Sequence, residues 1–348
     1  MNIHEKYIKR CIELAKNGLG TTYPNPLVGS VIVHKDRIIG EGWHQKAGAP
    51  HAEVNAVNSV KDESLLKKST IYVSLEPCSH FGKTPPCSDL IIAKGIKKVV
   101  IGCVDPFAEV AGRGIKKLME AGCEVQVGIL EKKCQDLNKR FFRFHQKKRP
   151  YIILKWAQTA DGFIAPEIQK KREPVWITNQ YSKQLVHKWR SEEQAILVGT
   201  NTAIADNPKL NTRLWNGKNP VRVVIDKELK IPQDSALFDG SIKTIVLTEE
   251  QPEKTSKGDN LVFKKLDFQQ NLPEQICEVL YRHNLQSVII EGGTKTLQTF
   301  IDADFWDEAR IFTGISEFYK GVKAPEFSGK ILSETTLERD NLKIYKND

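Results

Sequence analysis

Apolar residues follow two different spacings along the first part of the chain. Residues 28–44 (VGSVIVHKDRIIGEGWH) predict two strands joined by a turn at Lys35-Asp36, and later apolar runs predict further strands. Between the strands, apolar residues recur at helical offsets. The further strands are expected at 69–78, 97–106 and 123–130, and the helices at 51–60, 87–96, 114–120 and from residue 3 to Gly18 or Gly20. Because strands and helices alternate, this part predicts a three-layer α/β domain with a largely parallel sheet.

A second series of strands and helices follows residues 145–150 (HQKKRP), which are polar and basic, end in proline and predict a linker. Its strands are expected from residue 151 and then at 194–199, 221–226, 242–248, 287–293 and, last, 308–314, with helices at 179–192, 273–284 and after 293. The chain has no internal repeat. We therefore expect two different α/β domains, 1–145 and 150–348.

The composition of the chain limits the class of protein. Its formal charge of +9 comes from scattered lysines, whereas a nucleic-acid-binding protein more often gathers them with aromatic residues on one face. This charge suits an anionic small substrate and no nucleic acid. No apolar run approaches the roughly 20 residues that span a bilayer, and the first 20 residues predict an amphipathic helix rather than a secretory signal.

The cysteine content indicates the compartment. Seven cysteines are an odd number, in a chain too long to need disulfides for stability. We expect reduced thiols in the cytoplasm, where a cysteine cluster indicates a metal before a disulfide.

Two short motifs together predict a metal site. His51 begins a predicted helix, and the loop PCSHFGKTPPC (77–87) supplies Cys78 and Cys87. A catalytic zinc typically takes three protein ligands and leaves the fourth position for water, and these residues supply that number. We expect a helix N-terminus to favour the thiolate form of Cys78. The alternatives are a histidine satisfied at a helix start and two cysteines in core packing; the ordered occurrence of both motifs, each after a strand, favours zinc.

Glu53 lies two residues after His51 and is the predicted catalytic residue. A carboxylate beside a metal-activated water can take its proton and deliver it to a leaving amine. The general signature of zinc nucleobase deaminases is His-x-Glu followed by Pro-Cys-x-x-Cys. Here the second cysteine comes nine positions after the first, which departs from that signature.

The first domain resembles the deaminase half of the bifunctional riboflavin-biosynthesis deaminase/reductase family. The resemblance rests on TTYPNPLVGSVIV, HAE, EPCSHFGKTPPC, whose long insert is found in that family, and DPFAEVAGRG. It implies a cytidine-deaminase fold and hydrolysis of the exocyclic 2-amino group of a diaminopyrimidinone ribosylamine 5′-phosphate. The substrate contacts that it implies are Asn25, His44, His80 and Lys83. Lys83 could instead be a solvated loop residue, and His44 could cap or pack.

Two stretches of the second half indicate ligand binding. Residues 287–297 (SVIIEGGTKTL) predict a strand, a Gly-Gly turn and a helix, where exposed backbone N–H groups favour an anion. The turn alone is weak evidence, because it could be an ordinary connection. Residues 197–213 (LVGTNTAIADNPKLNTR) predict a polar loop after an apolar strand, which indicates a binding edge or simply a solvated loop.

These stretches, with LKWAQTADG, WIT and RVVID, resemble the reductase half of the same family. The resemblance implies a dihydrofolate-reductase-like fold that uses NADPH, and a homodimer or homotetramer built through the reductase domains. The implied NADPH contacts are Ala157, Trp176, Thr202, Asp206, Gly293, Thr294, Lys295, Thr296, Leu297, Gln298 and Thr299. The implied contacts to the substrate ribosyl phosphate are Arg190, Leu210, Arg213 and Glu291.

Two positions depart from the family pattern. Pro174 stands where the family usually has a serine, and Lys227 follows RVVID where a serine is common. A deaminase with a weakened or inactive reductase domain therefore remains an alternative. A zinc-containing nucleic-acid-binding protein is the alternative from another class, although a closed structural zinc site would need a fourth ligand. A base deaminase acting on RNA would leave the second half unexplained.

Overall fold

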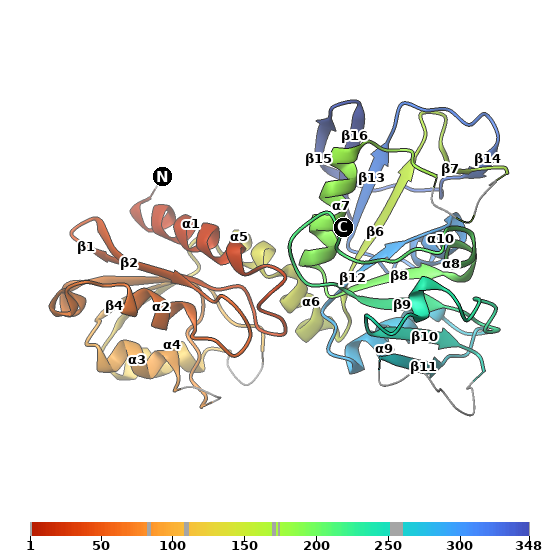
Figure 1. Ribbon diagram of the computed structural model, residues 1–348. Helices are drawn as coiled ribbons and strands as arrows, with labels where there is room; N and C mark the ends of the chain where they lie inside the picture. Colours follow the sequence, from red (N-terminus) through yellow and green to blue (C-terminus); the bar gives the residue numbers. More distant parts are fainter. Residues whose placement is uncertain are drawn as a thin grey trace. The chain divides into compact units, whose positions relative to one another are not determined.

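The computed structural model describes residues 2–81, 85–107, 111–168, 172, 175–250 and 260–347. The chain divides into two compact units, Met1–Lys148 and Arg149–Asp348 (Figure 1). Helix α6 (Lys139–Lys147) includes residues 145–147. The linker predicted at 145–150 is therefore helical over its first three residues.

The first unit is built on a mixed five-stranded sheet in the order β2-β1-β3-β4-β5. Its strands are β1 (Gly29–His34), β2 (Arg37–Trp43), β3 (Thr70–Leu75), β4 (Lys98–Cys103) and β5 (Glu124–Val127). Strands β3, β4 and β5 are parallel, whereas β1 is antiparallel to both β2 and β3. The expectation of a largely parallel sheet is thus wrong for β1 and β2. They form a hairpin, with Lys35 and Asp36 at φ +46° and +61° in its turn.

Helices cover both faces of this sheet, as the alternation of strands and helices predicts (Figure 1). They are α1 (Ile3–Ala15), α2 (Ala52–Asn58), α3 (Cys87–Ala93), α4 (Arg113–Glu120), α5 (Glu131–Leu137) and α6, with short 3-10 turns at Lys16–Gly18 and Glu63–Lys68. The core on one face joins α2, α3 and α4 to the sheet, and the core on the other joins α1 and α5 to it. The two faces bury different residues of the same strands, such as Ile32 and Val31 of β1, because side chains alternate along a strand.

The second unit is built on a nine-stranded sheet in the order β11-β10-β9-β8-β12-β6-β13-β16-β15. Its strands are β6 (Tyr151–Gln158), β8 (Ala195–Gly199), β9 (Val221–Ile225), β10 (Thr244–Thr248), β11 (Leu261–Lys265), β12 (Ser287–Glu291), β13 (Glu308–Thr313), β15 (Lys330–Leu337) and β16 (Asp340–Lys346). The strands from β11 to β13 in this order are parallel, and β16 and β15 continue the sheet antiparallel. Strands β7 (Phe163–Pro166) and β14 (Gly321–Lys323) pair separately.

Helices again form two outer layers, on a sheet whose central strands are buried on both faces (Figure 1). They are α7 (Gln180–Glu192), α8 (Thr200–Asp206), α9 (Leu272–Arg282) and α10 (Thr294–Asp302). Helices α9 and α10 contribute to one core, and α7 and α8 to the other. Among the described residues, no helix is both long and apolar enough to cross a bilayer.

Three details of the second unit differ from the sequence-based expectation. Residues 200–206 form α8 rather than a loop, because Ala203 packs into the core beneath polar neighbours. The strand at 308–313 is not the last one, since β14, β15 and β16 follow it. The edge strand β15 could not be predicted from apolar periodicity, because nearly all of its residues face solvent.

Candidate active sites

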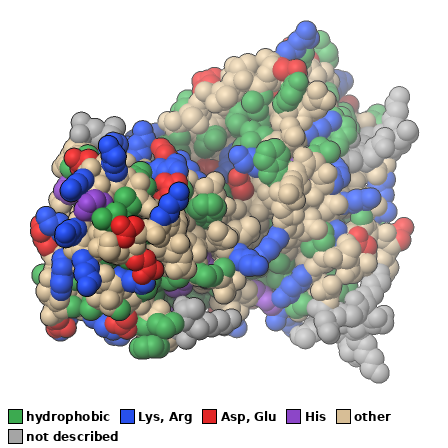
Figure 2. Space-filling model, turned by 60° about the vertical axis from the view of Figure 1, so that its left-hand side comes forward, with side chains coloured by type: hydrophobic (Ala, Val, Ile, Leu, Met, Phe, Trp, Pro, Cys, Tyr) green, Lys and Arg blue, Asp and Glu red, His purple; other side chains and the backbone are tan. Residues whose placement is uncertain are grey.

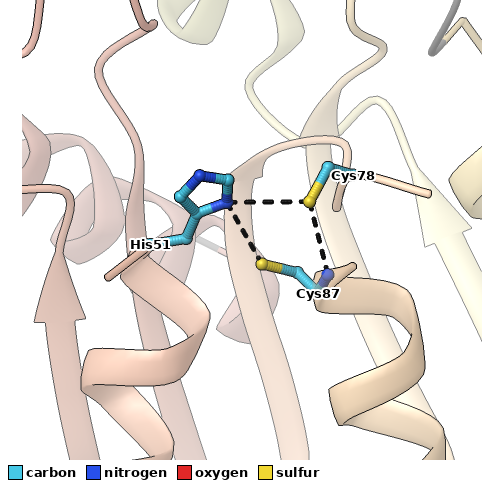
Figure 3. A group of neighbouring side chains, drawn as sticks. All are labelled: His51, Cys78 and Cys87. Atoms are coloured by element: carbon cyan, nitrogen blue, oxygen red, sulfur yellow. Dashed lines mark hydrogen bonds between the residues drawn. The ribbon is translucent and has the colours of Figure 1, made fainter. Parts of the chain in front are cut away.

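His51, Cys78 and Cys87 converge in the first unit (Figure 3). His51 precedes α2, Cys78 lies in the loop after β3, and Cys87 is the first residue of α3. The Nδ1 atom of His51 lies 3.6 Å from Cys78 Sγ and 3.3 Å from Cys87 Sγ. Tetrahedral zinc bound to one imidazole and thiolates holds these atoms about 3.5 Å apart. The three side chains therefore fit a zinc ion that keeps one position open.

The first residue of α3 stabilises the thiolate of Cys78. The backbone N–H of Cys87 donates to Cys78 Sγ over 3.3 Å. The Cys87 thiol is the largest cause that lowers the Cys78 pKa to about 4, and His51 adds to it. Cys78 itself lies outside the helix, so the predicted effect of a helix N-terminus reaches it through the Cys87 N–H group.

Glu53 is buried next to the three metal-ligating residues. It lies in the first turn of α2 and is 3% exposed. Burial raises the pKa of its carboxyl group to about 7, and the negative charge of the Cys78 thiolate adds to this effect. At this pKa the group can accept and release a proton near neutral pH, as a general acid and base must.

Asn25 and His44 form a hydrogen-bonded pair beside His51. The His44 ring is 2% exposed and meets the His51 ring edge to face, with centroids 5.3 Å apart. Its Nδ1 lies 3.1 Å from the Pro50 carbonyl oxygen, which only accepts, so Nδ1 carries the proton. Its Nε2 then accepts from Asn25 Nδ2 over 3.0 Å. These two hydrogen bonds fix the orientation of the Asn25 amide. Its nitrogen faces His44, and its oxygen is left for a ligand.

The other two predicted substrate contacts lie in the loop between the cysteines. His80 is exposed. It lies near the buried carboxyl of Asp105, whose pKa burial raises to about 6 although His80 acts in the opposite direction. Lys83 lies outside the described residues.

Glu76, which the sequence analysis did not single out, holds the segment around α4 against the metal-binding loop. Its carboxylate is 4% exposed and accepts four backbone N–H groups. The donors are those of Asp105, Gly112, Gly114 and Ile115, at 3.3, 3.0, 2.9 and 3.3 Å. A Cβ at Gly114 would lie 2.0 Å from the Pro77 carbonyl oxygen, so only glycine fits there. The signal was present in the sequence as an acidic residue at the end of a buried strand, directly before Pro77-Cys78.

The second unit carries a cleft of about 1430 Å³ at the carboxyl ends of its parallel strands. Ligands of open α/β sheets bind at this edge. The residues of this unit that were predicted to bind NADPH or the reductase substrate line the cleft, with one exception. Those that line it are Ala157, Trp176, Thr202, Asp206, Gly293, Thr294, Lys295, Thr296, Gln298, Thr299, Arg190, Leu210, Arg213 and Glu291. The exception is Leu297, whose side chain is wholly buried in the core beneath α10.

The glycine turn after β12 does not present its second N–H group to a ligand. The Gly293 N–H donates to Thr202 Oγ1 over 2.9 Å, which ties the start of α10 to α8. Gly292 has φ +138°, a conformation that favours glycine. The Gly293 N–H is therefore already used within the chain, and the anion site at this turn stays a prediction.

The cleft is nevertheless suited to anions. Its described lining holds eight Lys or Arg residues and four Asp or Glu residues. On the face that Figure 2 shows, by contrast, Lys and Arg side chains are spread among Asp and Glu rather than gathered in one stripe. The excess of positive charge in the cleft indicates a small anionic ligand.

A buried charged cluster lies in the cleft. Arg190 Nη2 donates to Glu291 Oε2 over 2.9 Å, and Lys155 Nζ lies 3.8 Å from Glu291 Oε1. Burial alone would raise the pKa of Glu291, but Arg190 and Lys155 outweigh it and hold that pKa below its ordinary value. Among the described residues, Arg190 Nε and Glu291 Oε1 have no hydrogen-bond partner. These atoms can bond a ligand. Lys155 was not predicted from the sequence, although a lysine inside an otherwise apolar strand was a signal for it.

His187 links α7 to the loop that carries Arg213. Its Nδ1 accepts the Arg213 backbone N–H over 3.1 Å, while Arg190 Nη1 donates to the Asn211 carbonyl over 3.4 Å. Burial, followed by the guanidinium groups of Arg190 and Arg213, lowers the pKa of His187 to about 4. His187 is therefore a neutral acceptor between two cations, and it was not predicted from the sequence.

Known families match both units. Residues 1–103 match the cytidine and deoxycytidylate deaminase zinc-binding region, and residues 150–314 match the RibD C-terminal domain. The chain is 38% identical over 339 residues to the riboflavin biosynthesis protein RibD of Aquifex aeolicus, covering 96% of this chain and 93% of that protein. It is 44% identical over 296 residues to the RibD of Actinobacillus pleuropneumoniae, covering 83% of this chain and 77% of the other.

Solved structures match over nearly the whole length. One is the diaminohydroxyphosphoribosylaminopyrimidine deaminase/5-amino-6-(5-phosphoribosylamino)uracil reductase of Thermotoga maritima, with TM-score 0.89, 37% identity and 99% of each chain covered. Another is the RibD of Acinetobacter baumannii, with TM-score 0.88, 31% identity, and 99% and 98% of the two chains covered.

Proposed function

Because the chain belongs to the RibD family of riboflavin-biosynthesis deaminase/reductases, we propose that its first unit deaminates a phosphorylated diaminopyrimidine and its second reduces the product. The substrate would be 2,5-diamino-6-ribosylamino-4(3H)-pyrimidinone 5′-phosphate. NADPH would then convert the ribosyl side chain to ribityl, giving 5-amino-6-ribitylamino-uracil 5′-phosphate. The first unit has the cytidine-deaminase fold and the second the dihydrofolate-reductase-like fold of the family.

The deamination rests on one observation: the buried carboxyl group of Glu53 lies beside His51, Cys78 and Cys87, which can hold a zinc ion. Zinc, when bound there, supplies a water of lowered pKa. Glu53 takes the proton of that water and returns it to the departing amine, so ammonia leaves as a neutral group. The free oxygen of Asn25 helps to orient the pyrimidine, and His44 contributes by holding the Asn25 amide and by packing beside the substrate. His80 and Lys83 are proposed to contact its phosphorylated ribose.

The reduction depends on alignment, because the nicotinamide carries the hydride. We place the substrate phosphate near Arg190 and Arg213, whose guanidinium groups can each bond it bidentately. Leu210 would pack against the ribosyl group. Lys155 and Glu291 lie on β6 and β12, where they can donate to and accept from the substrate ring or side chain. The proposed NADPH contacts are Ala157, Trp176, Thr202, Asp206 and residues 293–299, all of which line the cleft except Leu297.

Of the two positions that depart from the family pattern, the structure describes only Lys227. Pro174 lies outside the described residues. Lys227 lines the cleft and pairs with Glu249 over 3.4 Å, so a cation replaces the usual hydroxyl at the end of β9. A cation there suits a phosphorylated cofactor, which argues against the alternative of an inactive reductase.

The proposal extends to assembly and compartment. A homodimer or homotetramer is expected, and the exposed edge strand β15 offers unpaired backbone groups for a second copy. All seven cysteines are free thiols, which supports a reducing cytoplasm. Light scattering on the purified chain would measure the assembly.

One assay tests both proposed steps. The zinc-loaded chain is mixed with the diaminopyrimidine substrate, and ammonia release and NADPH absorbance are followed together. We expect ammonia first and NADPH oxidation after it. Ammonia without NADPH oxidation would leave the deaminase with an inactive reductase. Salt-dependent RNA binding without either reaction would favour the nucleic-acid-binding alternative.

A further inference from the structure

Asn138 binds both backbone groups of a residue 111 positions away. Its Oδ1 accepts the Leu27 N–H over 2.8 Å, and its Nδ2 donates to the Leu27 carbonyl over 2.8 Å. Asn138 lies between α5 and α6 and is 3% exposed, and Leu27 is 7% exposed. A side-chain amide that satisfies both groups of one residue acts like a neighbouring strand, and a buried pair of this kind is costly to break.

The residue held in this way ends the loop that carries Asn25. Prolines 24 and 26 flank Asn25 and have no backbone N–H. Within the loop, the Asn25 N–H reaches the Thr22 carbonyl over 2.9 Å, a contact local to the turn. The bonds from Asn138 tie Leu27, at the end of this loop, to the segment between α5 and α6. The next residue, Val28, accepts the His44 N–H over 3.0 Å, just before β1 begins at Gly29.

The loop position determines where the Asn25 amide lies. Asn25 Nδ2 must lie 3.0 Å from His44 Nε2, and the His44 ring is itself held on the Pro50 carbonyl and against His51. A small shift of the loop would break the Asn25–His44 bond and turn the amide oxygen away from its ligand. Misplacements of about 1 Å at a distance from the chemistry can cost on the order of 100-fold in rate.

We propose that Asn138 is a positioning residue for the deaminase substrate, acting through Leu27 on Asn25. This inference rests on the proposed deamination at the same site. Asn138 touches neither the metal-ligating residues nor Glu53 in any hydrogen bond described here. Its loss should therefore weaken substrate binding while the metal site persists.

The test compares Asn138→Ala, Asn25→Ala and the double variant in the zinc-loaded full-length chain. We expect each single change to raise the deaminase KM by about 10-fold or more, with a smaller effect on kcat. Zinc content and NADPH oxidation with added deaminated intermediate should stay at wild-type values, since the reductase of the same chain is an internal control. The double variant should be no worse than Asn25→Ala alone, because residues acting through one contact are not additive.

Further variants separate positioning from loss of fold. Asn138→Asp has the same shape and keeps the acceptor for the Leu27 N–H but loses the donor, so its KM should also rise; it replaces Asn138→Ala if the latter does not fold. Asn17→Ala removes an exposed asparagine of the same unit and should leave KM unchanged. An unchanged KM in Asn138→Ala and Asn138→Asp, or additive effects in the double variant, would overturn the inference. Wild-type chain that releases no ammonia would instead refute the proposed function.

Discussion

Arg190 and Glu291 lie 101 residues apart in sequence, and their side chains form a 2.9 Å ion pair in the cleft of the second unit. Both side chains are nearly buried, with 11% and 12% exposed. Lys155 approaches the same carboxylate. One buried carboxylate thus faces two cations, and the cluster keeps a net positive charge.

Glu291→Gln should destabilise the second unit and lower NADPH oxidation. The amide leaves Arg190 and Lys155 buried without a counter-charge, which costs about 3 kcal/mol of unfolding free energy. Denaturant unfolding and NADPH absorbance measure the two effects, and ammonia release should persist. Glu228→Gln is the matched control, because the Glu228–Lys230 pair is exposed to solvent and its loss should leave the unfolding free energy nearly unchanged. Equal unfolding free energies for the two variants would contradict the cluster's role.

Glu53→Gln should abolish ammonia release without removing zinc. The amide keeps the shape of the buried side chain but cannot carry a proton between the water and the amine. We expect a loss of about 10²- to 10⁴-fold in kcat. Metal analysis should give the wild-type zinc content, and NADPH oxidation with the deaminated intermediate should continue. Retained deamination would remove Glu53 from its proposed role.

Chelation of the metal should separate the two activities. Removal of zinc takes away the ion that lowers the pKa of the attacking water, so ammonia release stops. The cleft of the second unit contains none of these three ligands, so NADPH oxidation with the deaminated intermediate should be unchanged. Added Zn²⁺ should restore ammonia release. Parallel loss of both activities would speak against this assignment.

Gly114→Ala should destabilise the first unit and reduce its zinc content. The new methyl group would meet the Pro77 carbonyl oxygen, directly before Cys78, and such overpacking costs roughly 1–3 kcal/mol. Gly112→Ala is the matched control, since no atom lies within 4 Å of its Cβ and only its φ of +76° is strained. That strain costs about 1 kcal/mol. Calorimetry would measure the stability of both variants, and metal analysis their zinc content. A similar loss of zinc in both variants would contradict the steric explanation.

The stability of the second unit should depend on pH through His187. Its pKa is about 4 in the folded chain and about 6.5 when unfolded, so the unfolded chain binds the proton more tightly. The stabilising contribution of His187 is therefore complete above pH 6.5 and is lost as the pH falls towards 4. His187→Asn keeps an acceptor for the Arg213 N–H but does not titrate. The difference in Tm between wild type and this variant should shrink from pH 7 to pH 5, and a constant difference would exclude His187 as the cause.

The sequence was sufficient to predict those helices and strands whose apolar residues recur at a regular spacing. The hairpin at 28–44, α2, α3 and the central strands of the second unit occur where apolar spacing predicts them. The zinc ligands could be predicted because His51, Cys78 and Cys87 lie in short motifs, and the residue types define the chemistry. The family resemblance is confirmed over nearly the whole chain.

The remaining features depend on contacts between distant residues, which periodicity does not encode. Strand β15 is exposed over most of its length, and α8 is polar except for its buried face. Glu76, Asn138 and His187 look like ordinary polar residues in sequence. Their importance follows from partners 26 to 111 positions away, which only the folded chain brings together.

Each unit has hydrophobic clusters made entirely of its own residues, on either side of the division after Lys148. This separation has a genetic consequence. Missense mutations that destroy one core should leave the other half of the polypeptide folded, so loss-of-function alleles would sort into two groups. Two alleles, one from each group, should complement each other when they are expressed together. Such intragenic complementation should restore growth without added riboflavin.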